Sequence, residues 1–145
     1  MSGLLRKFRV TMRDFRTLVA WQRSHAFALR VYKVTARFPR DELYGLTSQM
    51  RGSAASVPTN IAEGCGSDGG LDLARFLQMG MRSASELDYQ LILARDLGYI
   101  TGDAHTPLET ELSEVKRILN ALIRKVRTDA RGGVPRYRAK PTANS

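Results

Sequence analysis

The sequence predicts an all-α protein, an up-down-up-down bundle of four helices, on three observations. Apolar residues recur every three or four positions over long stretches, no convincing β-strand pattern interrupts them, and short loops separate the periodic stretches. Helices of similar length joined by short loops pack antiparallel to their neighbours. With 145 residues, 43% of them hydrophobic, the chain suffices for one core, so we expect a single bundle over residues 14–128.

The first helix is expected from about Phe15 to Arg37, where Phe38-Pro39 ends it, because the residue before a proline disfavours the helical conformation. The second is expected to start near Asp41, and Pro58 should kink or divide it, since proline removes an amide donor. The spacing predicts inward-facing residues at Leu18, Trp21, His25, Ala28 and Tyr32 in the first helix and at Leu46, Met50, Ala54, Val57 and Ile61 in the second.

The third and fourth helices each carry an apolar seam. The third, at about 28 residues, should be roughly 42 Å long. The fourth is expected to begin with Thr106 as its N-cap and Pro107 in its first turn, with acids early and basic residues late, as the helix dipole favours. The predicted seams are Leu73, Leu77, Gly80, Ala84, Leu87, Leu91, Ala94 and Gly98, then Leu108, Leu112, Val115, Leu119, Leu122 and Val126.

Positive charge is concentrated at the two ends of the chain, whose formal net charge is +9. Residues 1–13 hold four basic residues and no acid, and residues 124–145 hold seven basic residues and one acid, so the ends carry +10 and residues 14–123 carry −1. In an up-down-up-down bundle the first helix starts and the fourth ends at the same pole. The basic ends therefore converge, either to contact nucleic acid or as solvated arms.

Arginine recurs every seven residues in the first helix and at the end of the fourth. We favour pairing of the first-helix arginines with acids on neighbouring helices or subunits, or a solvated face, over nucleic-acid contact. The acids considered are Asp72, Glu86, Asp88 and Asp96. The candidate nucleic-acid-binding residues are Arg6, Lys7, Arg9, Arg13, Arg16, Arg23, Arg30, Lys33, Arg37, Arg117, Arg124, Lys125, Arg127 and Arg131.

Patterns that resemble catalytic or cofactor sites are better explained structurally. Residues 64–69 match a G-x-G-x-x-G fingerprint, but a helix precedes them where a dinucleotide site needs a strand. A di-iron bundle needs a carboxylate three residues before each histidine, which neither His25 nor His105 has. We expect the former in the core or an interface and the latter in a loop. The lone Cys65 has no histidine nearby in sequence, so we expect no enzymatic activity, cofactor or metal.

Residues 60–64 read Asn-Ile-Ala-Glu-Gly, and this block, with Trp21-Gln22, Phe38-Pro39 and the runs 42–51 and 85–91, resembles a small bacterial four-helix-bundle family. The family is named after open reading frames in intervening sequences of 23S ribosomal RNA genes. The resemblance covers roughly residues 15–127. It implies a ring-shaped homopentamer, as in the similar accessory variability proteins of diversity-generating retroelements, which work with a reverse transcriptase and RNA. The resemblance implies a structural role for Asn60, Ile61, Ala62, Glu63 and Gly64.

We therefore expect a non-enzymatic homo-oligomer that binds RNA or other nucleic acid through basic surfaces; the alternative is an interaction scaffold for an unidentified protein. No apolar run of about 18 residues predicts a membrane span, and a lone cysteine fits the cytoplasm. Residues 1–13 are expected to be a basic extension, of which residues 1–11 contribute little to stability, and residues 129–145 a basic, disordered tail.

Overall fold

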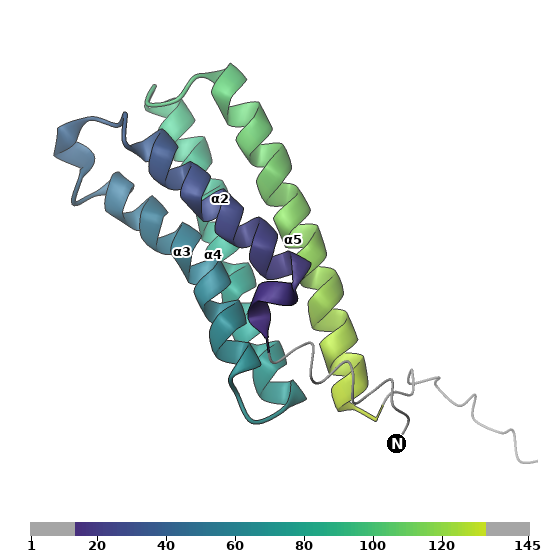
Figure 1. The fold of residues 1–145 in the computed structure, drawn as a ribbon. Coiled ribbons are helices and arrows are strands. Elements are labelled where there is room, and N and C mark those ends of the chain that lie inside the picture. The colour runs from purple at the N-terminus through teal and green to yellow at the C-terminus, as the bar shows by residue number, and fades with distance from the viewer. Residues whose placement is uncertain (1–13, 133–145) are drawn as a thin grey trace, which may run out of the picture.

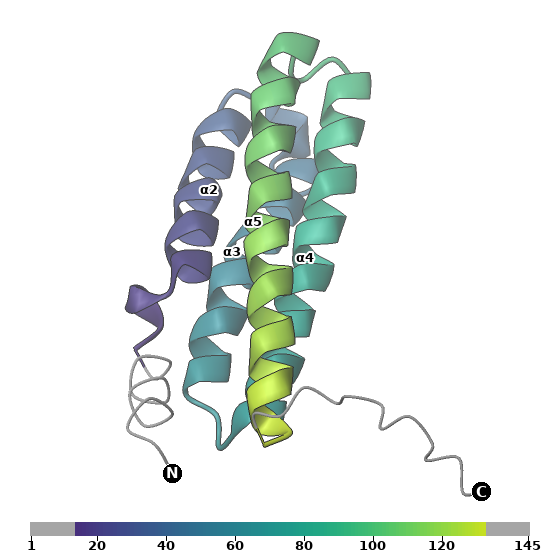
Figure 2. The same cartoon turned by 90° about the vertical axis from the view of Figure 1, so that its right-hand side faces the viewer.

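The computed structural model describes residues 14–132, which form four long α-helices and no strand, so the all-α prediction is confirmed (Figure 1). The elements are η1 Phe15–Thr17, α2 Val19–Thr35, η2 Arg40–Glu42, α3 Leu46–Cys65, α4 Gly70–Asp96 and α5 Gly102–Ala130, η1 and η2 being short 3-10 helices. Consecutive long helices run antiparallel, and α2 starts and α5 ends toward the same end of the bundle (Figure 2). α5 extends two residues past the boundary expected at 128, whereas residues 1–13 and 133–145 lie outside the described part.

The core is formed by the seams predicted for α3, α4 and α5. All five inward residues predicted in α3 are buried, and Met50 has no exposed surface. The α4 seam is buried from Leu73 to Ala94. The α5 seam is correct except at one turn, where Ile123 is buried and Leu122 only half-buried. Apolar periodicity in these helices therefore faces the common interior, as expected for bundle packing.

The inner face of α2 differs from the predicted one. His25 and Tyr32 are exposed and Trp21 is half-buried, although we expected all three to face inward. The buried residues of α2 are Ala20, Ser24, Phe27, Ala28, Val31 and Thr35. The apolar residues of α2 form two adjacent stripes, and the stripe through Phe27 and Val31 faces the core because α2 packs against both α3 and α5. The other stripe contains Trp21, His25 and Tyr32 and lies at the edge of α2 beside α3. We call it the aromatic stripe.

The connection between α2 and α3 is longer than predicted. α2 ends at Thr35 instead of Arg37, and α3 begins at Leu46 instead of near Asp41, with η2 between them. The carboxylate of Glu42 accepts a hydrogen bond from the Leu46 N–H at 3.2 Å. This bond satisfies one of the amide donors that a helix start leaves unpaired, and it fixes the later start of α3.

Two prolines lie inside helices, and neither one ends a helix. Pro58 does not divide α3, which is one of the two effects predicted for it, because the helix is continuous from Leu46 to Cys65. Thr101, not Thr106, is the N-cap of α5, because its hydroxyl accepts the Ala104 N–H at 3.1 Å. Pro107 therefore falls inside α5 instead of at its start. A proline removes only one N–H donor, so the other hydrogen bonds of each helix maintain it.

α4 ends before Gly98, which the periodicity had placed on its seam. Gly98 is exposed and has a φ of 79°, a left-handed conformation that favours glycine. The Tyr99 N–H donates to the Ala94 carbonyl at 2.9 Å, which closes the end of the helix. The role of this glycine is thus to turn the chain toward α5.

α3 and α4 approach closely where α3 ends. A Cβ atom added at Gly64 would lie 2.8 Å from Leu73 Cδ1 and 2.9 Å from Phe76 Cβ. Farther along the same pair of helices, the hydroxyls of Ser56 and Ser83 share a hydrogen bond of 2.9 Å. Small residues on α3 therefore set the distance between these two helices.

Candidate nucleic-acid interface

The charge of α5 is divided along its length. Residues 102–114 include four acids and no basic residue, whereas residues 115–131 include six basic residues and one acid. The acidic half lies near the α2–α3 connection, and the basic half lies near the loop between α3 and α4 (Figure 1). The helix dipole favours acids at the N-terminus and cations at the C-terminus, and the arrangement makes one end of the bundle positive.

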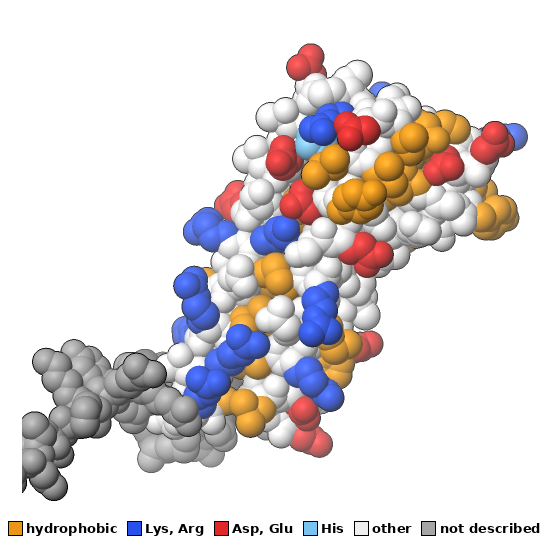
Figure 3. Space-filling model, turned by 180° about the vertical axis from the view of Figure 1, so that it is seen from behind, with side chains coloured by type: hydrophobic (Ala, Val, Ile, Leu, Met, Phe, Trp, Pro, Cys, Tyr) orange, Lys and Arg blue, Asp and Glu red, His pale blue; other side chains and the backbone are white. Residues whose placement is uncertain are grey.

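Arginines of α4 extend this positive surface. Arg127 Nη2 donates to Gln78 Oε1 at 3.5 Å, which places the last turns of α5 beside the first half of α4. Arg75 and Arg82 lie about one turn on either side of Gln78 and share its face of the helix. Figure 3 shows Lys and Arg side chains gathered over the lower half of this face. We call Arg75, Arg82, Arg117, Arg124, Arg127 and Arg131 the basic end.

Four of the six arginines of the basic end form no ion pair with an acid among the described residues. They are Arg82, Arg124, Arg127 and Arg131. Arg75 lies 3.7 Å from Asp72 and Arg117 lies 3.8 Å from Glu114, and both are exposed pairs within one helix, which contribute little. We did not include Arg75 or Arg82 among the sequence-based candidates. Arg75 and Arg82 are seven residues apart, the same spacing as in the predicted arginine stripe. This spacing could have identified them from the sequence.

The arginine stripe of α2 pairs with acids of α5. Arg23 Nη2 lies 3.1 Å from Glu114 Oε1, and Arg30 forms an ion pair with Glu111. The pairing favoured from the sequence is present, but its partners are not the acids we considered. One of those, Asp88, pairs with Lys116 of α5 at 3.0 Å. Two stripe arginines therefore connect α2 to α5, which makes them less available to phosphates.

The remaining candidates are dispersed. Arg16 lies 3.6 Å from Asp14, and its guanidinium stacks over the Phe15 ring at 4.8 Å. Lys33 and Arg37 are exposed at the opposite end of α2 from the basic end (Figure 1). Lys125 is exposed in the last turns of α5. The candidates that lie outside the described residues are Arg6, Lys7, Arg9 and Arg13. The structure thus brings the α5 candidates together with two arginines of α4.

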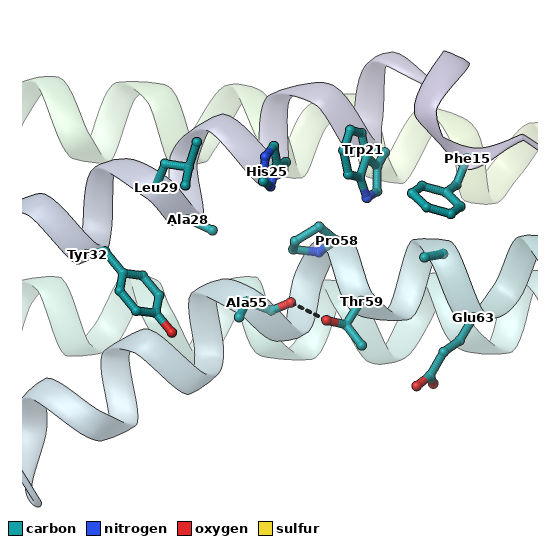
Figure 4. A pocket seen from close by; sticks show the side chains of 11 residues that line it. Phe15, Trp21, His25, Ala28, Leu29, Tyr32, Ala55, Pro58, Thr59 and Glu63 are labelled. Carbon is teal, nitrogen blue, oxygen red and sulfur yellow. Dashed lines mark hydrogen bonds between the residues drawn. The ribbon is translucent and has the colours of Figure 1, made fainter.

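An apolar groove of about 430 Å³ runs between α2 and α3 (Figure 4). Its α2 wall is the aromatic stripe, in which the Trp21 and His25 rings stack with centroids 4.8 Å apart. Its α3 wall includes Ala62 and Glu63 of the Asn-Ile-Ala-Glu-Gly block, whereas Ile61 of that block is buried in the core. We call it the aromatic groove, represented by Trp21, His25, Leu29, Tyr32, Ala62 and Glu63.

Other chemistry has little support among the described residues. Burial, and then the charge of Asp14, raises the pKa of the Cys65 thiol from 9.0 to about 11, so the thiol is protonated at neutral pH and a poor nucleophile. His105, which we expected in a loop, is buried in α5 with Nδ1 3.7 Å from Glu109 Oε2, because the helix starts earlier than predicted. Residues 14–132 hold no cluster of three side chains able to bind a metal. None of their helices combines the length and apolarity needed to cross a membrane.

A family model described as 23S rRNA-intervening sequence protein matches residues 16–121. The chain belongs to this family. A crystal structure of a protein of unknown function from the S23 ribosomal protein family of Bacteroides thetaiotaomicron has the same fold, with a TM-score of 0.68 and 22% sequence identity over 73% of this chain and 96% of that one. At that identity the likeness establishes the fold alone. No curated protein is detectably similar in sequence.

The match to the family divides the candidate surfaces. The aromatic groove lies within residues 16–121 except for Phe15 at its end. Of the basic end, Arg75, Arg82 and Arg117 lie inside the matched range, whereas its last three arginines lie beyond it. The groove is therefore formed almost entirely by the family's shared domain, and the charge at the end of α5 is contributed by the adjoining segment.

Proposed function

We propose that this family member is a non-enzymatic, cytoplasmic homo-oligomer that binds RNA through the basic end. The observation that supports this most is the segregation of charge along α5, which leaves four arginines at one end of the bundle without an acidic partner among residues 14–132. Such arginines attract phosphates and release condensed counterions on binding, largely regardless of sequence. Arg75 and Arg82 widen the surface across two helices, so it can follow a nucleic-acid backbone.

The homo-oligomer, a homopentameric ring by the family resemblance, is supported by exposed apolar side chains on separate faces of the bundle. Several copies would present several basic ends, and avidity would convert weak single contacts into useful affinity. Light scattering after size exclusion should give a multiple of 16.2 kDa. A monomer at micromolar concentration would reject the ring.

The nucleic-acid proposal is tested with two triple variants that each remove three positive charges. The variants are Arg82→Gln/Arg124→Gln/Arg131→Gln at the basic end and Lys33→Gln/Arg37→Gln/Arg40→Gln at the opposite end. Fluorescence anisotropy with a labelled single-stranded RNA of mixed sequence would be recorded over a salt series. Each phosphate contact contributes about −0.7 to the slope of log affinity against log salt, so the first variant should flatten the slope by about 2. The second should keep the slope of the wild type.

An interaction scaffold without nucleic-acid binding is the competing function. Its support is the aromatic groove, an apolar surface suited to another protein. If the wild type fails to bind mixed RNA or DNA at about 50 mM salt, where electrostatic binding is strong, nucleic-acid binding is rejected and the scaffold becomes the better account. Equal weakening by both triple variants would also reject the basic end as the binding surface.

A further inference from the structure

The outer face of α4 carries a second apolar surface. Tyr89 is 60% exposed and Leu97 is 51% exposed, and the half-buried Leu93 lies between them. The three residues are four positions apart and form one row along the helix. Figure 3 shows hydrophobic side chains gathered on the upper part of this face, whereas most of the Lys and Arg side chains lie on its lower part. We call Tyr89, Leu93 and Leu97 the α4 ridge.

The α4 ridge and the aromatic groove lie on different faces of the bundle. The groove runs between α2 and α3, which lie in front of α4 in Figure 1, and the ridge is on the outer face of α4, toward the viewer of Figure 3. A chain therefore cannot place its own ridge in its own groove. Contact between the ridge of one copy and the groove of the next is heterologous, and it closes a ring when the rotation between copies permits.

The dimensions of the two surfaces match. Trp21 and Tyr32 are eleven residues apart along α2, so this part of the groove is about 16 Å long. Tyr89 and Leu97 are eight residues apart along α4, so the ridge is about 12 Å long. The ridge therefore fits within the length of the groove.

The charges at the ends of the two surfaces are complementary, although the exposed Glu63 also lines the groove and Asp14 lies 3.6 Å from Arg16. Guanidinium groups cover the two ends of the groove, where Arg16 stacks over Phe15 and Arg51 over Tyr32, each at 4.8 Å. The exposed acids Glu86 and Asp96 flank the ridge. Asp96 Oδ1 also accepts a hydrogen bond from Arg95 Nε at 3.1 Å. Opposite charges at the rims would orient one copy relative to the next.

We infer that the α4 ridge of one copy packs into the aromatic groove of the next copy. The inference rests on the proposed homo-oligomer and names the two surfaces that join its subunits. Contact would cover Leu29 and Tyr89, the most exposed apolar side chains of the groove and of the ridge. It would leave the basic end uncovered, because the ridge occupies the other half of α4.

The test uses three single variants that place a carboxylate on an exposed apolar site. Leu29→Glu changes the groove, Tyr89→Glu changes the ridge, and Leu71→Glu is the control, because Leu71 is 66% exposed on α4 but lies outside the ridge. Circular dichroism melts verify that each variant is folded. Light scattering should give about 16.2 kDa for the first two and the wild-type mass for the control.

Mixing the two dissociated variants tests the head-to-tail geometry. Leu29→Glu retains an intact ridge and Tyr89→Glu an intact groove, so an equimolar mixture should form a dimer of twice the chain mass and nothing larger. Dissociation by Leu29→Glu alone, or an oligomeric Tyr89→Glu, would overturn the inference and assign the groove to another occupant. Deletion of residues 2–13 should leave the number of subunits unchanged, which excludes that segment as the occupant.

The outcomes separate this inference from the proposed function. An oligomeric wild type whose mass is unaffected by Leu29→Glu contradicts the ridge and groove contact but retains the homo-oligomer. A monomeric wild type contradicts both. Nucleic-acid binding is judged independently by the salt slopes of the basic-end variants, which depend on phosphate contacts and not on mass.

Discussion

The α3–α4 pair and the α2–α5 pair are held together in different ways. α3 meets α4 through close approach at Gly64 and a half-buried network in which the Ser56 hydroxyl accepts from Asn60 Nδ2 at 3.0 Å and shares a hydrogen bond of 2.9 Å with the Ser83 hydroxyl of α4. α2 meets α5 partly through the exposed ion pair of Arg23 with Glu114 and the half-buried ion pair of Arg30 with Glu111. A close-packed contact is distorted when even one atom is added to it. An exposed ion pair can instead be replaced by contacts with water at little cost in free energy. The first pair should therefore determine stability and the second should tolerate change.

The largest effect is expected at Gly64. In Gly64→Ala the new Cβ would lie within 3 Å of Leu73 and Phe76, and overpacking of this kind destabilises by about 1–3 kcal/mol. The matched control is Gly52→Ala in the same helix, where an added Cβ meets no atom within 4 Å. It should stabilise by about 0.5–1 kcal/mol through helix propensity. Urea unfolding measures the free energy of unfolding of both variants. Changes of the same sign in the two would contradict the role of close packing at Gly64.

The next effect is expected at Asn60. Asn60→Ala removes hydrogen bonds to the Ser56 carbonyl and to the Ser56 hydroxyl, the latter at 3.0 Å, and should cost about 1–2 kcal/mol. Thr59→Ala is the control. Thr59 is next to Asn60 in the sequence, and its hydroxyl donates a hydrogen bond to the Ala55 carbonyl at an exposed position. Thermal melts that show equal losses for the two variants would mean that the half-buried network adds nothing specific.

A pH-dependent effect is expected at Cys65. Because burial raises the pKa of the folded thiol from 9.0 to about 11, the unfolded chain releases this proton first as the pH rises. Stability from this group is therefore fully present below about pH 9 and is lost between about pH 9 and pH 11. The difference in urea midpoint between pH 8 and pH 10.5 should be smaller in Cys65→Ala than in the wild type. An identical difference in the two proteins would place the thiol in a more solvated setting.

The smallest effect is expected for the α2–α5 ion pairs. A double-mutant cycle on Arg23→Gln and Glu114→Gln should give a coupling energy below about 1 kcal/mol. The salt slope of RNA binding should be unchanged in Arg23→Gln, since this arginine is paired with an acid of α5 and not part of the basic end. A flatter slope would show that the stripe also contacts phosphate.

The sequence was sufficient to predict the four helices and most of the core. The seams of α3, α4 and α5 follow from local periodicity, because a helix whose apolar residues form one stripe has only one face to bury. The charge division along α5 is likewise a property of the sequence alone. The resemblance in Trp21 and residues 60–64 was enough to identify the family, which the match over residues 16–121 confirms.

Tertiary structure decided which neighbour each surface meets. α2 has two apolar stripes, and only packing against α3 and α5 buries Phe27 and leaves Trp21 and Tyr32 to line a groove. Arg23 and Arg82 look alike in sequence, but Arg23 forms an ion pair with Glu114 of α5, whereas Arg82 forms no ion pair within the described residues. Periodicity is a property of one helix, whereas ion pairs and grooves depend on two, so the sequence pattern determines faces and the fold determines partners.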